Sequence, residues 1–284
     1  MLRGIVYTAV AMLAFAGNSI LCRMALRDGA IDPASFTSIR LLSGALALLL
    51  IVRLTTGSSA ISGHGGWISS SMLFAYAICF SYAYVSLHAG VGALILFGCV
   101  QGTMIAMAFW SGDRPNLSEW MGWLLASGGL VWLLLPGIEA PSPGGAALMA
   151  LAGIAWGVYS IRGRGETDAL AATCSNFALS LAFVGVLTVV TYGTASISNR
   201  GVLFAILSGA LTSGIGYVIW YAALNHLRAM QAALVQLSVP AITAAGGVAL
   251  LGEPVSVRLL AAGALILGGI GIAVVRKSER KVNS

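Results

Sequence analysis

The sequence predicts an all-α membrane protein with ten transmembrane helices, arranged as two inverted-topology repeats of five. Three observations lead to this prediction. Hydrophobic residues make up 58% of the 284 residues and charged residues only 8%, whereas a water-soluble domain has about 25% charged residues. The apolar residues gather in long runs. A pattern near the start of the chain also recurs close to its middle.

Ten apolar runs are long enough to be membrane spans, because a hydrocarbon core of about 30 Å requires about 20 residues of helix. The runs are continuous rather than alternating, which favours helices over a barrel. In order along the chain, the expected spans are residues 4–24, 34–53, 67–87, 89–109, 118–136, 143–162, 169–190, 200–222, 230–251 and 257–275.

Short breaks of turn-forming or charged residues justify these boundaries. The clearest breaks are Asp28-Gly29 and Asp32-Pro33 before the second run, Gly63-His64-Gly65-Gly66 before the third, Asp113-Arg114-Pro115 before the fifth, Pro141-Ser142-Pro143 before the sixth and Glu253-Pro254 before the tenth. No long polar loop interrupts the chain, which leaves no room for a soluble catalytic domain.

The first run has two interpretations. A basic residue, an apolar stretch and Ala14-Phe15-Ala16 are typical of a cleaved signal peptide and of a first membrane helix. Residues 11–23, however, match residues 152–164 at five of thirteen positions, with a constant offset of 141. The second copy lies where no signal peptide can be, so we expect the first copy to be a retained helix.

The repeat extends through both halves of the chain. Residues 92–102 resemble residues 231–241, and residues 111–134 resemble residues 251–274. Each half has five runs, and because five is odd, the second half must enter the membrane from the opposite side. Such inverted halves are a hallmark of secondary transporters, which bind their substrate between the halves. The expected domains are 1–140, 141–276 and a basic cytoplasmic tail, 277–284.

Basic residues predict the orientation. Ten of the 15 Lys and Arg residues fall on the side of the two termini, and four fall on the other side. Because cytoplasmic loops are enriched in Lys and Arg, we expect a multi-pass protein of the cytoplasmic (inner) membrane with both termini in the cytoplasm. The basic residues are scattered, apart from those of the tail, so nucleic acid is not an expected partner.

The positions of the acidic residues bear on ion coupling. All nine lie in loops, at the ends of runs or in the tail. A proton-coupled carrier usually needs a buried group that changes its charge, so we expect uniport or facilitated diffusion. His88 and His226 are the remaining titratable candidates, and a packing or loop role is preferred for each because both lie near span ends.

Neutral polar and aromatic side chains occupy the middle of the runs instead. Rings and single amides together suit a flat, partly apolar, neutral or zwitterionic ligand, although for any single ring a role in helix packing is preferred. Arg40 is the one charge inside a span. Two roles are open for it, contact with a substrate carboxylate and a structural role, and the structural role is preferred. The expected binding residues are Asn18, Tyr82, Tyr84, Gln101, Trp156, Tyr159, Asn176, Tyr217, Tyr221 and Gln236.

Three segments carry a further pattern: "LAFAGNSILCR" (13–23), "PASFTSIRLLSGALALL" (33–49) and the stretch 230–270 that begins "MQAALVQLSVPAITAAGG". These segments resemble the drug/metabolite transporter superfamily, specifically its ten-helix EamA-type carriers. Among these carriers the chain is most similar to the YddG-type exporters of aromatic amino acids. The resemblance implies alternating access between two five-helix halves and export of amino acids, aromatic ones first, and related metabolites.

Other functions are weighed against this expectation. The same fold could serve other metabolites or cationic drugs, since rings attract cations. An intramembrane enzyme is disfavoured because the sequence has no GxSG, no HExxH and no mid-span aspartate pair. A scaffold would have no reason to repeat in inverted topology. We expect a small-molecule substrate and the lipid bilayer as partners, no cofactor or metal, and no required oligomer.

Overall fold

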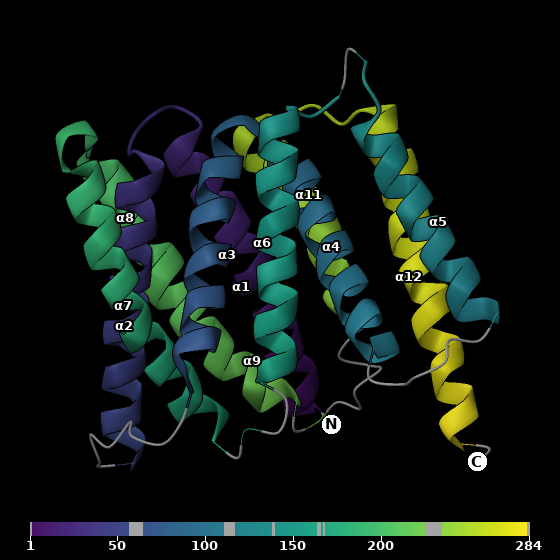
Figure 1. The fold of residues 1–284 in the computed structure, drawn as a ribbon, viewed down its shortest axis with the longest axis horizontal. Helices are drawn as coiled ribbons and strands as arrows, with labels where there is room; N and C mark the ends of the chain where they lie inside the picture. The colour runs from purple at the N-terminus through teal and green to yellow at the C-terminus, as the bar shows by residue number, and fades with distance from the viewer. Residues whose placement is uncertain are drawn as a thin grey trace.

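The computed structural model is a bundle of long helices (Figure 1). It describes residues 2–56, 65–110, 117–137, 140–163, 166, 168–224, 226 and 235–282. Within these ranges no strand forms, and a single β-bridge joins Ile31 to Ile197. The chain therefore has the all-helical architecture that its apolar runs predict.

The helices of the first half are α1 (Leu2–Leu26), α2 (Pro33–Thr56), α3 (Trp67–Ser86), α4 (Ala89–Trp110) and α5 (Leu117–Leu134). Those of the second half are α6 (Pro143–Arg162), α7 (Ala169–Thr191), the 3-10 turn η1 (Tyr192–Thr194), α8 (Asn199–Ile206), the π-helical η2 (Leu207–Ile215), α9 (Gly216–Leu224), α11 (Ser238–Leu251) and α12 (Val257–Val282). The run at 200–222 thus contains three consecutive helical segments, α-helical, π-helical and again α-helical, which the apolar pattern alone does not distinguish.

Seven stretches within these helices are long and apolar enough to cross a membrane, so the protein is a multi-pass membrane protein. They are Arg3–Leu26, Pro33–Thr55, Trp67–Ser86, Ala89–Met107, Pro143–Arg162, Ala169–Thr194 and Asn199–Trp220. The runs expected at 118–136, 230–251 and 257–275 correspond to shorter apolar helices, Trp120–Leu134, Ser238–Leu251 and Val257–Ile272.

Local chemistry explains where several helices begin. The side chains of Ser142, Asp168 and Ser198 each accept a hydrogen bond from the backbone N–H three residues on, and so cap α6, α7 and α8. Pro143 follows its cap at the first helical position, where its missing N–H costs nothing. Gly252, at a left-handed φ of 63°, ends α11.

Glycines set the closest helix contacts. A Cβ on Gly153 of α6 would lie 2.7 Å from the carbonyl oxygen of Leu96 in α4, and one on Gly157 would lie 2.8 Å from Cβ of Thr103. Gly209 of η2 packs in the same way on the backbone of Arg40 in α2. These contacts bring backbones together in lipid, where small residues rather than the hydrophobic effect allow close association.

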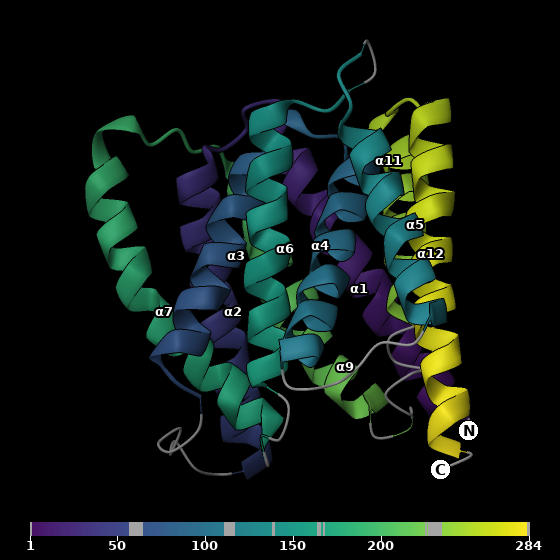
Figure 2. The same ribbon diagram turned by 45° about the vertical axis from the view of Figure 1, so that its right-hand side comes forward.

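Two helices stand apart from the others. α5 and α12 pack mainly on each other at one edge of the bundle, whereas α7 lies toward the opposite edge (Figures 1 and 2). The remaining helices enclose the middle of the molecule, where Phe36, Phe80 and Phe177 are fully buried. Large apolar side chains such as Val189 and Val190 are exposed on the outside, as expected for a surface in contact with lipid.

Candidate functional site

A small cavity lies at the centre of the bundle, between helices of both halves. Its volume is about 30 Å³, enough for a few water molecules, whereas ligand pockets usually measure about 300–1,000 Å³. In this conformation the cavity is therefore much smaller than a usual ligand pocket. Its lining residues are Phe15, Asn18, Ser19, Tyr76, Phe80, Leu96, Phe97, Trp156, Thr212, Ser213, Tyr217 and Gln236.

Trp156 of α6 is the centre of an aromatic cluster at this cavity. Its ring lies 4.8 Å from that of Tyr76 and 5.3 Å from that of Tyr217, measured between centroids, and it stacks on Tyr159 at 5.3 Å. Phe15 of α1 meets Tyr217 edge-on at 5.9 Å. These are favourable aromatic geometries, and the rings come from both halves of the chain.

Asn18 is the hub of the polar contacts at the cavity. Its Oδ1 accepts a hydrogen bond from Ser208 Oγ at 2.7 Å and a longer one from Thr212 Oγ1 at 3.4 Å. Its Nδ2 donates to the hydroxyl oxygen of Tyr76 at 3.3 Å. One amide in α1 thus connects η2 with α3 across the middle of the bundle.

Arg40 lies directly behind this wall of the cavity. The side chain is 1% exposed, and its Nη2 donates to the hydroxyl oxygen of Tyr76 at 3.2 Å. Its guanidinium carbon lies 5.1 Å from the ring centroids of both Tyr76 and Phe80, a cation–π arrangement. Nε and Nη1 have no hydrogen-bond partner in the described part of the chain.

Comparisons with known proteins identify the family to which this architecture belongs. The profile of the EamA-like transporter family matches residues 2–135 and, separately, residues 143–275. This chain belongs to the EamA-like transporter family. The members of this family are membrane transporters rather than enzymes, so this protein is an EamA family membrane transporter.

Individual relatives are similar to this chain over most of its length. "Uncharacterized protein PA1977" of Pseudomonas aeruginosa is 49% identical over 278 residues, which are 98% of this EamA-like chain and 96% of the relative. "Uncharacterized transporter YoaV" of Bacillus subtilis is 20% identical over 89% of this chain and 90% of its own length. A solved crystal structure covers 98% of both chains with a TM-score of 0.68 and 19% identity, which supports the fold.

The structure of this EamA-like transporter brings four of the expected binding residues to the cavity wall. Asn18, Trp156, Tyr217 and Gln236 all line it. Tyr159 lies just behind them, stacked on Trp156. The side chain of Tyr221 lies outside the described part of the chain.

Four other expected residues are placed away from the cavity lining. Tyr82 is 39% exposed on the outer surface, and Gln101 is buried among helices without lining the cavity. Tyr84 donates its hydroxyl proton to the carbonyl oxygen of Ala89 at 3.2 Å. Asn176 accepts a hydrogen bond from the N–H of Gly66 at 3.0 Å, beside the start of α3. The last two contacts are structural.

Sequence reasoning missed several residues of the lining. Tyr76 and Phe80 are the most consequential, because both contact Arg40 as well as the cavity. The spacing of four residues between them puts both on one face of α3, and this spacing was the available signal. Ser213 also lines the cavity, and its hydroxyl has no hydrogen-bond partner among the described residues.

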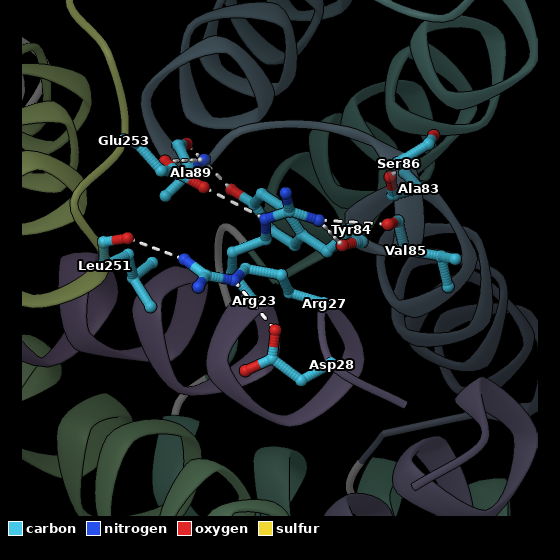
Figure 3. Close-up of polar contacts among 10 residues, drawn as sticks. All are labelled: Arg23, Arg27, Asp28, Ala83, Tyr84, Val85, Ser86, Ala89, Leu251 and Glu253. Atoms are coloured by element: carbon cyan, nitrogen blue, oxygen red, sulfur yellow. Dashed lines mark hydrogen bonds and ion pairs between the residues drawn. The ribbon is translucent and has the colours of Figure 1, made fainter. Parts of the chain in front are cut away.

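A second polar cluster lies at the end of the bundle where α1 finishes (Figure 3). Arg23 Nε and Glu253 Oε1 form an ion pair of 3.0 Å, with the two side chains 9% and 7% exposed. Arg23 Nη1 also donates to the carbonyl oxygens of Tyr84 and Val85 at the end of α3. Glu253 Oε2 accepts the N–H of Ala89 at the start of α4 at 2.7 Å.

The charges of this Arg23–Glu253 cluster fit the helix ends that they meet. The cation lies at the C-terminal ends of α1 and α3, and the carboxylate lies at the N-terminal end of α4, as the helix dipoles favour. A neighbouring contact, from Arg27 Nη1 to the carbonyl oxygen of Leu251 at 2.6 Å, joins α1 to α11. The cluster therefore ties both halves of the chain together on one side of the cavity.

His88 and His226 are both exposed, and neither lines the cavity. Of the described residues, none that lines the cavity is acidic, basic or a histidine. No group of three or more His, Cys, Asp or Glu in the described ranges is arranged to hold a metal ion.

Proposed function

We propose that this transporter exports amino acids, aromatic ones favoured, and related small metabolites across the cytoplasmic membrane by facilitated diffusion. The observation that carries the proposal is the central cavity, which is lined by rings and neutral polar groups from both halves. Stacked rings suit a flat apolar side chain, and amide and hydroxyl groups suit its polar end. A YddG-type specificity for aromatic amino acids is the form of this proposal that the ring content favours.

The helix contacts support two equivalent halves, residues 1–140 and 141–276. α3 packs on α6, and α8, η2 and α9 pack on α1; α4 packs on α6, and α11 packs on α1. Exchanging the two halves maps each of these contacts onto its counterpart. The family profile also matches each half separately. A pair of related five-helix units is the architecture from which alternating access follows.

Contacts at the helix ends support an inverted arrangement. Arg23, in the last turn of α1, contacts the end of α3, and Ser86 of α3 lies 2.6 Å from Ser142, the residue that caps the start of α6. At the other end of α6, Arg162 donates to Ser69 in the first turn of α3 at 3.2 Å. α1 therefore finishes on the side where α6 begins, as the opposed senses of the two halves require.

The charges favour one assignment of the two membrane faces. Arg53 and Arg162 end helices on the side opposite the Arg23–Glu253 cluster, and the positive-inside rule makes that side cytoplasmic. The cluster then closes the outer side of the cavity. Substrate would enter from the cytoplasm, and opening of the cluster would release it outside.

The neutral lining supports facilitated diffusion. The described cavity residues include no group that changes its charge near neutral pH, and such a group is what proton coupling usually requires. We therefore expect the concentration gradient of the substrate to drive export.

Flux into proteoliposomes tests the proposal. Labelled phenylalanine, tryptophan, threonine, adenine and a quaternary ammonium dye are offered under matched gradients. We expect phenylalanine and tryptophan to move fastest and an imposed proton gradient to produce no uphill accumulation. Movement of only adenine or the dye would refute the substrate class, and uphill transport driven by protons would refute the mechanism.

A further inference from the structure

We infer that the cavity recognises a carboxylate on its ligand through the hydroxyl proton of Tyr76, with Arg40 as the positive charge behind that hydroxyl. This inference rests on the proposed function, because it names the chemical group that the transported molecule must carry.

The hydroxyl group of Tyr76 accepts two hydrogen bonds at the cavity wall. A phenolic hydroxyl has one proton to donate and two lone pairs to accept with. Both lone pairs of Tyr76 are used, by Asn18 Nδ2 at 3.3 Å and by Arg40 Nη2 at 3.2 Å. Its proton is left for an acceptor, and since Tyr76 lines the cavity, an acceptor within the cavity is in position to take it.

The orientation of the Asn18 amide supports this assignment. The contact between Ser208 Oγ and Asn18 is 2.7 Å, whereas the contact between Asn18 and Tyr76 is 3.3 Å. The shorter distance is typical of O–H···O, and the hydroxyl of Thr212 approaches the same Asn18 atom at 3.4 Å. Asn18 presents its oxygen to these two hydroxyls and its NH₂ group to Tyr76.

Arg40 places a buried positive charge beside Tyr76. Arg40 is 1% exposed, and two of its three nitrogens have no hydrogen-bond partner among the described residues. The ion pairs of the described chain join Arg23 to Glu253 and Arg27 to Asp28, and neither involves Arg40. A buried cation without a counter-charge is costly, so a negatively charged ligand nearby is strongly favoured and a cationic one is disfavoured.

Among anions, a carboxylate fits this cavity better than a phosphate does. Phosphate sites usually gather several Lys or Arg donors, whereas the described lining of this cavity is neutral and has the single cation Arg40 behind it. One hydroxyl donor with one positive charge behind it suits the single charge of a carboxylate. Trp156 and Tyr217 then remain to contact an apolar side chain. The favoured ligand is a monocarboxylate that carries a flat apolar group.

Ligand-dependent thermal stabilisation of the detergent-solubilised protein tests this without depending on transport. Three ligands of similar shape are compared: 3-phenylpropionate, its neutral amide 3-phenylpropanamide, and the cation 3-phenylpropylamine. We expect 3-phenylpropionate to bind at least tenfold more tightly than either of the others. Equal binding of all three, or tighter binding of the amine, would overturn the inference.

Three variants locate the effect. Tyr76→Phe keeps the ring and should reduce 3-phenylpropionate affinity about tenfold while leaving the amide unchanged. Arg40→Met should abolish the preference for the carboxylate, and Arg40→Lys should restore it in part, which a purely structural role would not produce. Tyr82→Phe removes a hydroxyl on the outer surface and is the matched control. A Tyr76→Phe variant that retains the full carboxylate preference would refute the role of the hydroxyl.

The outcome also separates this inference from the proposed function. Selective binding of the carboxylate without phenylalanine flux would retain the binding site and refute the exporter. Phenylalanine flux accompanied by equal binding of all three ligands would retain the exporter and refute the carboxylate contact.

Discussion

Replacing Glu253 with glutamine should open the outer side of the cavity. The glutamine side chain would retain one acceptor oxygen, whereas Glu253 uses two, one for Arg23 Nε at 3.0 Å and one for the N–H of Ala89 at 2.7 Å. Complete loss of one partner of a buried ion pair costs about 3–5 kcal/mol. Arg23 would keep its two carbonyl acceptors, so we take a smaller cost of about 2 kcal/mol, near the value of one hydrogen bond to a charged group.

If the Arg23–Glu253 cluster forms only while the outer side is closed, this cost shifts the equilibrium toward the outward-open state. A cost of about 2 kcal/mol corresponds to a shift of about 30-fold. Ser19 lines the cavity, so a Ser19→Cys reporter in a background without the native cysteines measures its accessibility. We expect a membrane-impermeant thiol reagent, added on the Arg23 side, to label this cysteine about 30-fold faster in Glu253→Gln.

The control is Asp28→Asn, which breaks the neighbouring Arg27–Asp28 ion pair. The side chains of Arg27 and Asp28 are 38% and 55% exposed. Because exposed ion pairs contribute little to stability, the labelling rate should not change. An unchanged rate in a folded Glu253→Gln protein would mean that the cluster does not hold the outer side closed.

Four further predictions follow from the cavity, the packing and the loops. Trp156→Ala and Tyr217→Ala should each reduce phenylalanine flux at least tenfold while Trp132→Ala, on the outer surface, leaves it intact; normal flux in both cavity variants would place the site elsewhere. Gly153→Val should lower the melting temperature, because its new side chain meets the backbone of α4; an unchanged melting temperature would contradict the described contact. Burial raises the pKa of Asp32, but hydrogen bonds from Ser35, Ser196 and Ala34 outweigh it and lower the pKa overall. The stability that Asp32 contributes is therefore present above its unfolded pKa of about 3.9 and is lost as the pH falls through the lower folded value, so melting curves of the wild type should show an acid-side loss that is reduced in Asp32→Ala. Asp32→Ala should also cost about 1 kcal/mol at neutral pH, because Asp32 accepts the N–H of Ser35 in the first turn of α2, and an unchanged unfolding free energy would argue against this cap.

Much of the fold could be predicted because lipid imposes simple length and composition rules. The starts of α2, α3 and α6, at Pro33, Trp67 and Pro143, lie within one residue of the expected spans. The π-helical segment could not be predicted, since its residues are as apolar as those of an ordinary helix. Residues 227–234, which include the expected start of the ninth span, lie outside the described chain.

The site was harder to predict than the fold. In a soluble helix, apolar periodicity separates the inner face from the outer face, but a membrane helix is apolar on both. Tyr76, which faces the cavity, and Tyr82, which faces outward, therefore look alike in sequence. Asn18 was identifiable because an amide in the middle of a span is costly unless it has partners. Asn176 has the same signal, and its partner Gly66 belongs to a loop that no local pattern connects with it.

The π-helical turns of η2 fix how the two parts of the eighth span face one another. Ser208, within η2, bonds Asn18, and Tyr217, just after it, reaches the cavity. Each residue of an α-helix turns the chain by about 100°. Deleting one residue between these two would rotate Tyr217 away by roughly that angle while Ser208 stayed in place. The wide turns therefore set the rotation of Tyr217 relative to Ser208. The number of residues between positions 208 and 217 is as constrained as the identity of those residues.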